Sequence, residues 1–204
     1  MTETEWQNAA DPHPMLELLR AKASDRKLRL FAVACSRRIW TLIDALGQAA
    51  VEVAENYADG LAGPDEMRTV RLRCQGMGGQ ASWYAAATKP EVAARNAARS
   101  AQAGVASNPL LGTEDAELLT QAVLLRDIFG DPFRPVSVDP TWLLPAVVEL
   151  AQAIYDDRAF DGMPDLADAL HEAGCTEAKI LSHCRSEGPH VRGCWVVDLI
   201  LGKE

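Results

Sequence analysis

Prolines and glycines divide this chain into helix-like segments of roughly ten to twenty residues, and this punctuation is the strongest constraint on its fold. The prolines at plausible first helical positions are Pro14, Pro64, Pro90, Pro145 and Pro164. Proline lacks a backbone N–H, but at the first position of a helix that group has no partner within the helix, so its absence is not destabilising. The glycines suited to end helices are Gly60, Gly130, Gly174 and Gly202. The pattern predicts an all-α fold, a compact bundle of about eight to ten helices, with no credible sheet.

Two segments show how such helices would pack. After Ser24, a predicted helix places Leu28, Phe31 and Cys35 within one apolar stripe, with Arg26, Arg29 and Arg37 on the opposite side. The closing run, VRGCWVVDLILG, is apolar on nearly every side of a helical wheel. A helix of that kind is normally central, so we expect a central C-terminal helix in which Asp198 is buried and has a polar partner.

A chain of 204 residues suits a single domain, here residues 1–204. Within it, the alanine-rich segment 81–107 permits close helix approach but offers little specific packing, and we expect it to be the least defined part. Gly76, Gly78 and Gly79 interrupt the helical pattern before it. Four prolines rule out a regular helix between 130 and 145, which predicts a proline-rich loop.

The charge pattern disfavours nucleic acid as a partner. The net charge is −9, although Arg20 to Arg38 holds seven basic residues and one acid. We expect that basic segment to pair with the chain's own carboxylates or to be solvated. The polar, acidic opening and the lack of a long apolar run predict a protein with no signal peptide and no membrane span. With an odd number of cysteines at irregular spacing, we expect a cytoplasmic location.

Chemistry-bearing residues are densest in the last thirty positions. Cys175, Cys184, His190 and Cys194 follow the spacing C-x8-C-x5-H-x3-C, and His183 is a spare ligand. Thiolates and imidazoles are the ligands of structural zinc sites, so one interpretation of this set is a zinc site. The short C-x2–4-C pairs of common zinc knuckles are absent, and cysteine is often an ordinary core residue. We therefore expect these thiols to fill the core, with no cofactor, and keep zinc as the alternative.

A catalytic function has weaker support. His190 and Asp198 could serve a hydrolase or a transferase in a pocket beneath the proline-rich loop. A histidine that follows Gly188-Pro189 more often caps the next helix or hydrogen-bonds a loop carbonyl than acts as a base. We expect no catalytic residue.

Several sequence segments of this chain resemble those of a family of bacterial proteins. They are the opening M-T-E-x-E-W, ASDRKLRLFAVACSRRIW, YDDRAF, and GPHVRGCWVVDLILGKE near the end. The resembling family is uncharacterised and occurs as many paralogues, sometimes beside other domains. The resemblance covers about residues 1–60 and 125–204. It implies no activity, ligand or catalytic residue for any position.

These observations favour a protein-interaction or regulatory module without catalysis, acting on an unknown protein partner. Tryptophan and arginine dominate binding hot spots. The residues predicted to contact the partner are Arg26, Arg29, Arg37, Arg134 and Trp142.

Overall fold

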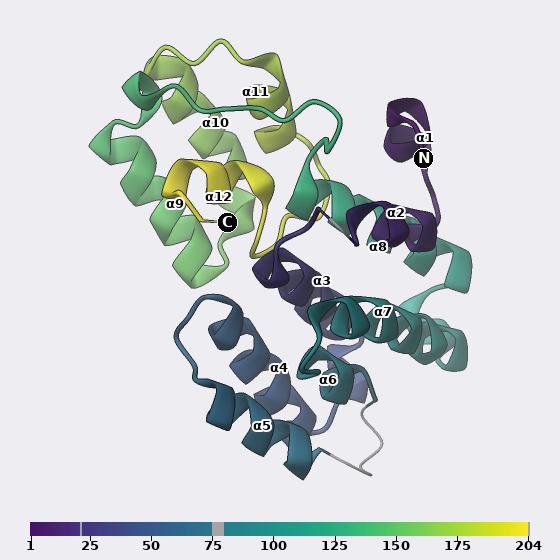
Figure 1. The fold of residues 1–204 in the computed structure, drawn as a ribbon. Coiled ribbons are helices and arrows are strands. Elements are labelled where there is room, and N and C mark those ends of the chain that lie inside the picture. Colours follow the sequence, from purple (N-terminus) through teal and green to yellow (C-terminus); the bar gives the residue numbers. More distant parts are fainter. Residues whose placement is uncertain (21, 75–79, 204) are drawn as a thin grey trace. The chain divides into compact units, whose positions relative to one another are not determined.

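Helices and their connections account for the whole computed structural model, which describes residues 1–20, 22–74 and 80–203 (Figure 1). The described residues form twelve α-helices and no strand, so the all-α prediction is confirmed. The helices are α1 (Glu3–Asn8), α2 (Pro12–Leu19), α3 (Asp25–Arg38), α4 (Ala45–Ala58), α5 (Pro64–Arg73), α6 (Gln80–Ala85), α7 (Pro90–Ser107), α8 (Glu114–Phe129), α9 (Pro145–Asp157), α10 (Met163–Glu172), α11 (Ala178–Cys184) and α12 (Trp195–Leu201).

Prolines begin helices much as the sequence predicts. Pro64, Pro90 and Pro145 are the first residues of their helices, and Pro164 lies one residue inside α10. Helix α2 differs from the prediction, because it begins at Pro12 and not at Pro14. Asp11, just before it, accepts a hydrogen bond from the His13 N–H. In the part of the chain that the structure describes, no helix combines the length and the hydropathy that crossing a bilayer requires.

The helix after Ser24 ends at Arg38, and a 3₁₀ turn at Trp40–Leu42 follows it. Another helix boundary differs from the prediction. The last helix begins at Trp195 instead of Val191, because Gly193 takes a φ of 91°, a left-handed conformation that breaks the helix. The interruption expected at Gly76, Gly78 and Gly79 lies outside the described residues.

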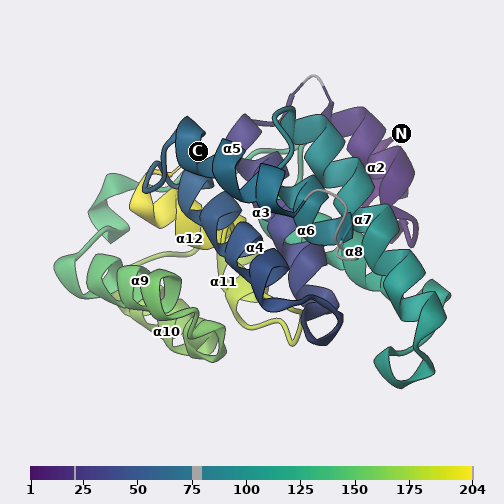
Figure 2. The same cartoon turned by 90° about the horizontal axis from the view of Figure 1, so that it is seen from below.

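The helices form two compact units, residues 1–126 and 127–204, and the boundary falls within α8. In the first unit, α3 packs against α4, α6 and α7, and α5 lies along α4 (Figure 2). Leu28, Phe31 and Cys35 of α3 are buried, as its periodicity predicts, but every residue from 28 to 36 is buried too, so burial is not confined to one face of this helix. That the whole chain is one domain stays a prediction.

The alanine-rich segment forms α6 and the 18-residue helix α7. Ala93, Ala97 and Ala101 of α7 are completely buried, and this helix packs along α3. A Cβ built on Gly104, farther along α7, would lie 3.2 Å from Cγ2 of Ile39. These small buried side chains fit the close helix approach that the sequence predicts, and that the segment is the least defined part stays a prediction.

Carboxylates of the chain neutralise much of the basic helix. Arg26 Nε lies 3.1 Å from Asp59 Oδ1, and Arg37 donates a hydrogen bond of 2.8 Å to the buried Glu55. Arg38 Nε donates to Glu117 over 3.1 Å. These contacts agree with the interpretation that the basic segment pairs within the chain.

The second unit packs α9, α10, α11 and α12 around one apolar core. Cys175, Cys184 and Cys194 are part of this core, with no exposed surface. Residues 130–144 contain no α-helix, in agreement with the predicted proline-rich loop, and one 3₁₀ turn at Pro140–Trp142 interrupts them. Val196, Val197, Asp198 and Ile200 are the buried residues of α12.

Candidate metal centre

Four potential metal ligands meet in the second unit. They are Asp127 near the end of α8, His183 on α11, and His190 and Cys194 on the segment that joins α11 to α12. Each offers one ligand atom, and these four atoms lie within 4.8 Å of one another. Among the described residues, this is the one group of three or more His, Cys, Asp or Glu side chains close enough to hold an ion.

The distances within the cluster centre on Asp127 and His183. Oδ1 of Asp127 lies 2.7 Å from Nδ1 of His190 and 3.1 Å from Nε2 of His183. The same His183 Nε2 lies 3.2 Å from Sγ of Cys194. The His183 Nε2 atom thus faces two other potential ligand atoms, a carboxylate oxygen and a sulfur.

Backbone and side-chain contacts hold the ligands in these orientations. Oδ2 of Asp127 accepts a hydrogen bond of 3.0 Å from the Val191 N–H, which leaves Oδ1 to the cluster. Nε2 of His190 lies 3.4 Å from the Ser186 carbonyl oxygen, so Nδ1 is the nitrogen that faces Asp127. Outer contacts of this kind set the tautomer of metal-binding histidines.

Glycine at position 130 brings Trp195 against the cluster. The Trp195 ring lies 5.2 Å from the His183 ring, measured between centroids. A Cβ built on Gly130 would lie 3.2 Å from Cγ of the same Trp195 ring. Gly130 also ends α8 with a φ of 61°. The residue that ends the helix thus leaves room for the ring that covers His183.

Burial and close contact shift the ionisation of these groups. Burial raises the pKa of Asp127, but the hydrogen bonds from His183 and His190 outweigh it and the pKa is lowered. Burial lowers the pKa of His190. The hydrogen bond with Asp127 and the charge of that carboxylate raise this pKa by more than burial lowers it, so the net shift is upward. Burial, together with the charge of Asp127, raises the pKa of the Cys194 thiol well above its ordinary value. Without a cation this thiol stays protonated, whereas a bound metal deprotonates its thiol ligand.

Sequence analysis named four metal ligands, and the structure brings two of them together. His190 and Cys194 are in the cluster, joined by the spare ligand His183. Cys175 and Cys184 lie outside it, buried in the apolar core. Cys184 follows His183 directly on α11, and adjacent residues of a helix point about 100° apart.

Asp127 is the ligand that the sequence analysis missed, 56 residues before His183. A signal was present in the segment LLRDIFG. An acid in the last turn of a helix meets the negative end of the helix dipole, so a carboxylate there needs a specific partner. Its near-complete burial, at 3 % exposure, fits that need.

The residues predicted to contact a partner have other surroundings. Arg26 and Arg37 are ion-paired, and Arg29 is buried with 3 % exposure. Trp142 packs partly against the core of the second unit, and Arg134 is exposed.

The catalytic alternative paired His190 with Asp198. The carboxylate that His190 Nδ1 contacts is that of Asp127, and Asp198 is buried on α12 at 1 % exposure.

The cluster has the donor set of a closed zinc site. Two imidazoles, one thiolate and one carboxylate are four ligands of types that Zn²⁺ accepts in a tetrahedron. The charges of one thiolate and one carboxylate would cancel those of Zn²⁺, so the loaded centre would be neutral. Neutrality matters because burying a net charge is costly.

Comparison with models of protein families, with curated proteins and with solved structures gives no match to this chain. The resemblance to a paralogous bacterial family therefore stays a prediction.

Proposed function

We propose that this protein is a helical zinc-binding module, in which Asp127, His183, His190 and Cys194 hold one structural Zn²⁺. The observation that supports it is the convergence of four ligand atoms of three chemical kinds within 4.8 Å of one another. The side chains of Asp127, His183 and His190 are 3 %, 17 % and 5 % exposed, and Cys194 is fully buried.

The role proposed for the metal is structural rather than catalytic. Catalytic zinc keeps one coordination position open for water or substrate, whereas structural zinc takes all four ligands from the protein. Here the protein offers four. The ion would join the end of α8, α11 and the segment before α12. A zinc ion would therefore fix the segment 185–194, which has no helix of its own.

Metal analysis of the untagged protein tests this proposal directly. We expect about one zinc per chain after purification without chelators, and a content below roughly 0.1 would rule it out. Cys194→Ser and His183→Gln should lower the content strongly. Cys175→Ala is the matched control, because it removes another buried thiol of the same unit that lies outside the cluster.

Cobalt substitution gives a second readout. Bound Co²⁺ in a tetrahedral site with one thiolate should show d–d absorption and a thiolate-to-metal charge-transfer band. Cys194→Ser should lose the charge-transfer band, and Cys175→Ala should keep it. Equal spectra for the two variants would show that the thiol of Cys194 does not bind the metal.

A protein-interaction role, predicted from the sequence, is compatible with a structural zinc and stays a prediction. Of its five residues, Arg134 is the arginine that the structure leaves exposed.

A further inference from the structure

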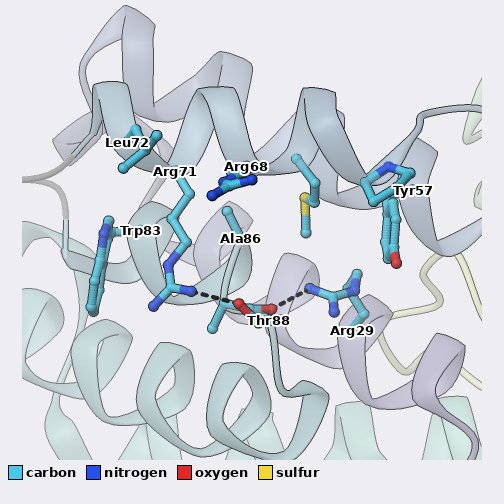
Figure 3. A pocket seen from close by; sticks show the side chains of 11 residues that line it. Arg29, Tyr57, Arg68, Arg71, Leu72, Trp83, Ala86 and Thr88 are labelled. Atoms are coloured by element: carbon cyan, nitrogen blue, oxygen red, sulfur yellow. Dashed lines mark hydrogen bonds between the residues drawn. The ribbon is translucent and has the colours of Figure 1, made fainter.

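The first unit contains a cavity of about 490 Å³ whose charged lining residues are all arginines (Figure 3). Helices α3, α4, α5 and α6 and the residues after α6 form its walls. The lining residues are Arg29, Tyr57, Pro64, Met67, Arg68, Arg71, Leu72, Trp83, Ala86, Ala87 and Thr88. Cavities of roughly 300–1,000 Å³ are the usual size of small-molecule sites.

One face of α5 supplies almost half of this lining. Pro64, Met67, Arg68, Arg71 and Leu72 follow the spacing i, i+3, i+4, i+7, i+8, so they lie along one side of the helix. A face that only filled a core would be apolar throughout. Here two of its five positions are arginines, which gives the cavity wall a positive charge.

Two of the arginines are held in place by contacts on the cavity wall. Arg29 Nη1 donates to the carbonyl oxygens of Ala85 and Ala87, over 3.0 and 2.9 Å, and its guanidinium lies 5.1 Å from the centre of the Tyr57 ring. Arg71 Nη1 donates to Thr88 Oγ1 over 2.8 Å, and the Arg71 guanidinium lies 4.7 Å from the centre of the Trp83 ring. Figure 3 shows both guanidinium groups pointing toward the stretch that ends at Thr88. Stacked, anchored guanidinium groups lose little entropy when they bind a ligand.

The arginines of the cavity wall differ from three arginines of α3 in forming no ion pair with a carboxylate of the described residues. Arg26, Arg37 and Arg38 each pair with an acid of the chain. Among the described residues, no ion pair includes Arg29, Arg68 or Arg71, and the cavity lining contains no Asp or Glu. Burial lowers the pKa of Arg29, yet an arginine remains charged at neutral pH. Three cations therefore face one cavity with no anion of the chain among its lining residues.

We propose that this cavity binds a small organic anion, with a carboxylate or phosphate group among Arg29, Arg68 and Arg71 and an apolar body against Met67, Leu72 and Ala86. The guanidinium fork matches the oxygens of either group. The site is separate from the zinc cluster, and its tests do not depend on metal.

Calorimetric titration of the full chain at low salt tests the proposal with four probes. Benzoate and phenyl phosphate carry the two anionic groups on an apolar ring, inorganic phosphate lacks the ring, and phenol lacks the strong anion. We expect one or both ring-bearing anions to bind at least about tenfold more tightly than inorganic phosphate or phenol. Which one binds more tightly distinguishes a carboxylate ligand from a phosphate ligand.

Arg68→Gln provides the decisive variant, because Arg68 is exposed and its loss should not prevent folding. It should weaken binding of the preferred anion by about tenfold or more. Arg73→Gln is the matched control, since it removes the same charge from an exposed position of α5 outside the cavity lining. Absence of binding by both ring-bearing anions, or equal weakening by the two variants, would overturn the proposal.

Discussion

Helix α8 buries two carboxylates whose partners differ in kind. Glu117, in the first unit, accepts hydrogen bonds from Arg38 Nε over 3.1 Å and from Gln121 Nε2 over 2.8 Å. Asp127, in the second unit, faces two imidazoles and a thiol. Both carboxylates are almost fully buried, at 1 % and 3 % exposure.

Glu117 belongs to a structural ion pair, whereas the side chains around Asp127 can exchange protons and bind a metal ion. Arginine is always protonated and has no lone pair to offer a metal, so the partners of Glu117 can only neutralise and orient it. Imidazole and thiol groups gain and lose protons and bind cations through lone pairs. The burial of a carboxylate does not by itself indicate a function. The chemistry of the side chains around it does.

The largest effect is expected from breaking the ion pair between Arg38 and Glu117. Glu117→Ala removes the acceptor of one Gln121 N–H and of Arg38 Nε, whose side chain is 39 % exposed, and should lower the free energy of unfolding by about 3 kcal/mol. Urea unfolding measures this loss, which should be the same with and without a chelator. Glu114→Ala, at an exposed position in the first turn of α8, should cost less than about 1 kcal/mol. Similar losses for the two variants would show that the buried pair contributes little.

Metal removal should have the next largest effect, and it rests on the proposed zinc site. With free zinc at a hundred times its Kd, binding adds about 2.7 kcal/mol to stability, and a chelator should remove this increment. Thermal unfolding with zinc and with chelator measures the difference. Asp127→Ala should make the two curves coincide, whereas Glu117→Ala should leave them apart. Coincident curves for the wild-type protein would contradict the prediction.

A smaller effect is expected at the end of α8. Gly130→Ala forces alanine into a φ of 61° and places a Cβ 3.2 Å from the Trp195 ring, which should cost about 1–2 kcal/mol. Gly60→Ala is the control, because Gly60 also has a positive φ, 73°, but its Cβ would contact nothing within 4 Å. Since Trp195 packs on His183, we expect Gly130→Ala also to weaken zinc binding, and Gly60→Ala to leave it unchanged. Zinc titrations that do not separate the two variants would contradict this coupling.

The smallest effect is a pH dependence of stability that arises in the cluster of Asp127, His183, His190 and Cys194. The pKa of His190 in the folded, metal-free protein is raised above 6.5, so its stabilising contact with Asp127 is fully present below that pH and is lost as the pH rises through the raised value. With a chelator present, the free energy of unfolding should decline as the pH rises from about 6.5 through the raised pKa of His190. Urea titrations at stepped pH should show that Asp127→Asn reduces this decline and Glu117→Gln does not. An unchanged decline in Asp127→Asn would assign it to other groups.

Much of the fold could be predicted from the sequence because its helix signals are local. Pro64, Pro90 and Pro145 mark the first residues of their helices, and the periodic stripe of α3 is buried as expected. The short helix α1 was missed, although Thr2 and Glu5 form a capping box there, since its six residues contain too little apolar periodicity to reveal it.

The candidate site was only partly visible in the sequence. Spacing drew attention to His190 and Cys194, but it cannot show which way a helix turns its side chains, and so Cys184 was favoured over its neighbour His183. Asp127 is distant in sequence, and its approach to the cluster depends on tertiary packing. The cavity was missed for the same reason, because Arg68 and Arg71 look like an ordinary solvated helix face until α3 and α6 are placed opposite them.

The buried alanines of α7 restrict how this segment can change in evolution. Where Ala93, Ala97 and Ala101 have no exposed surface, any larger residue would have to push the neighbouring backbone away. Substitutions there should be limited to glycine, serine and alanine, while exposed positions of the same helix, such as Glu91 and Val92, can vary freely. Relatives of this protein could therefore differ widely in the exposed residues of α7 and still keep the same spacing between α7 and α3.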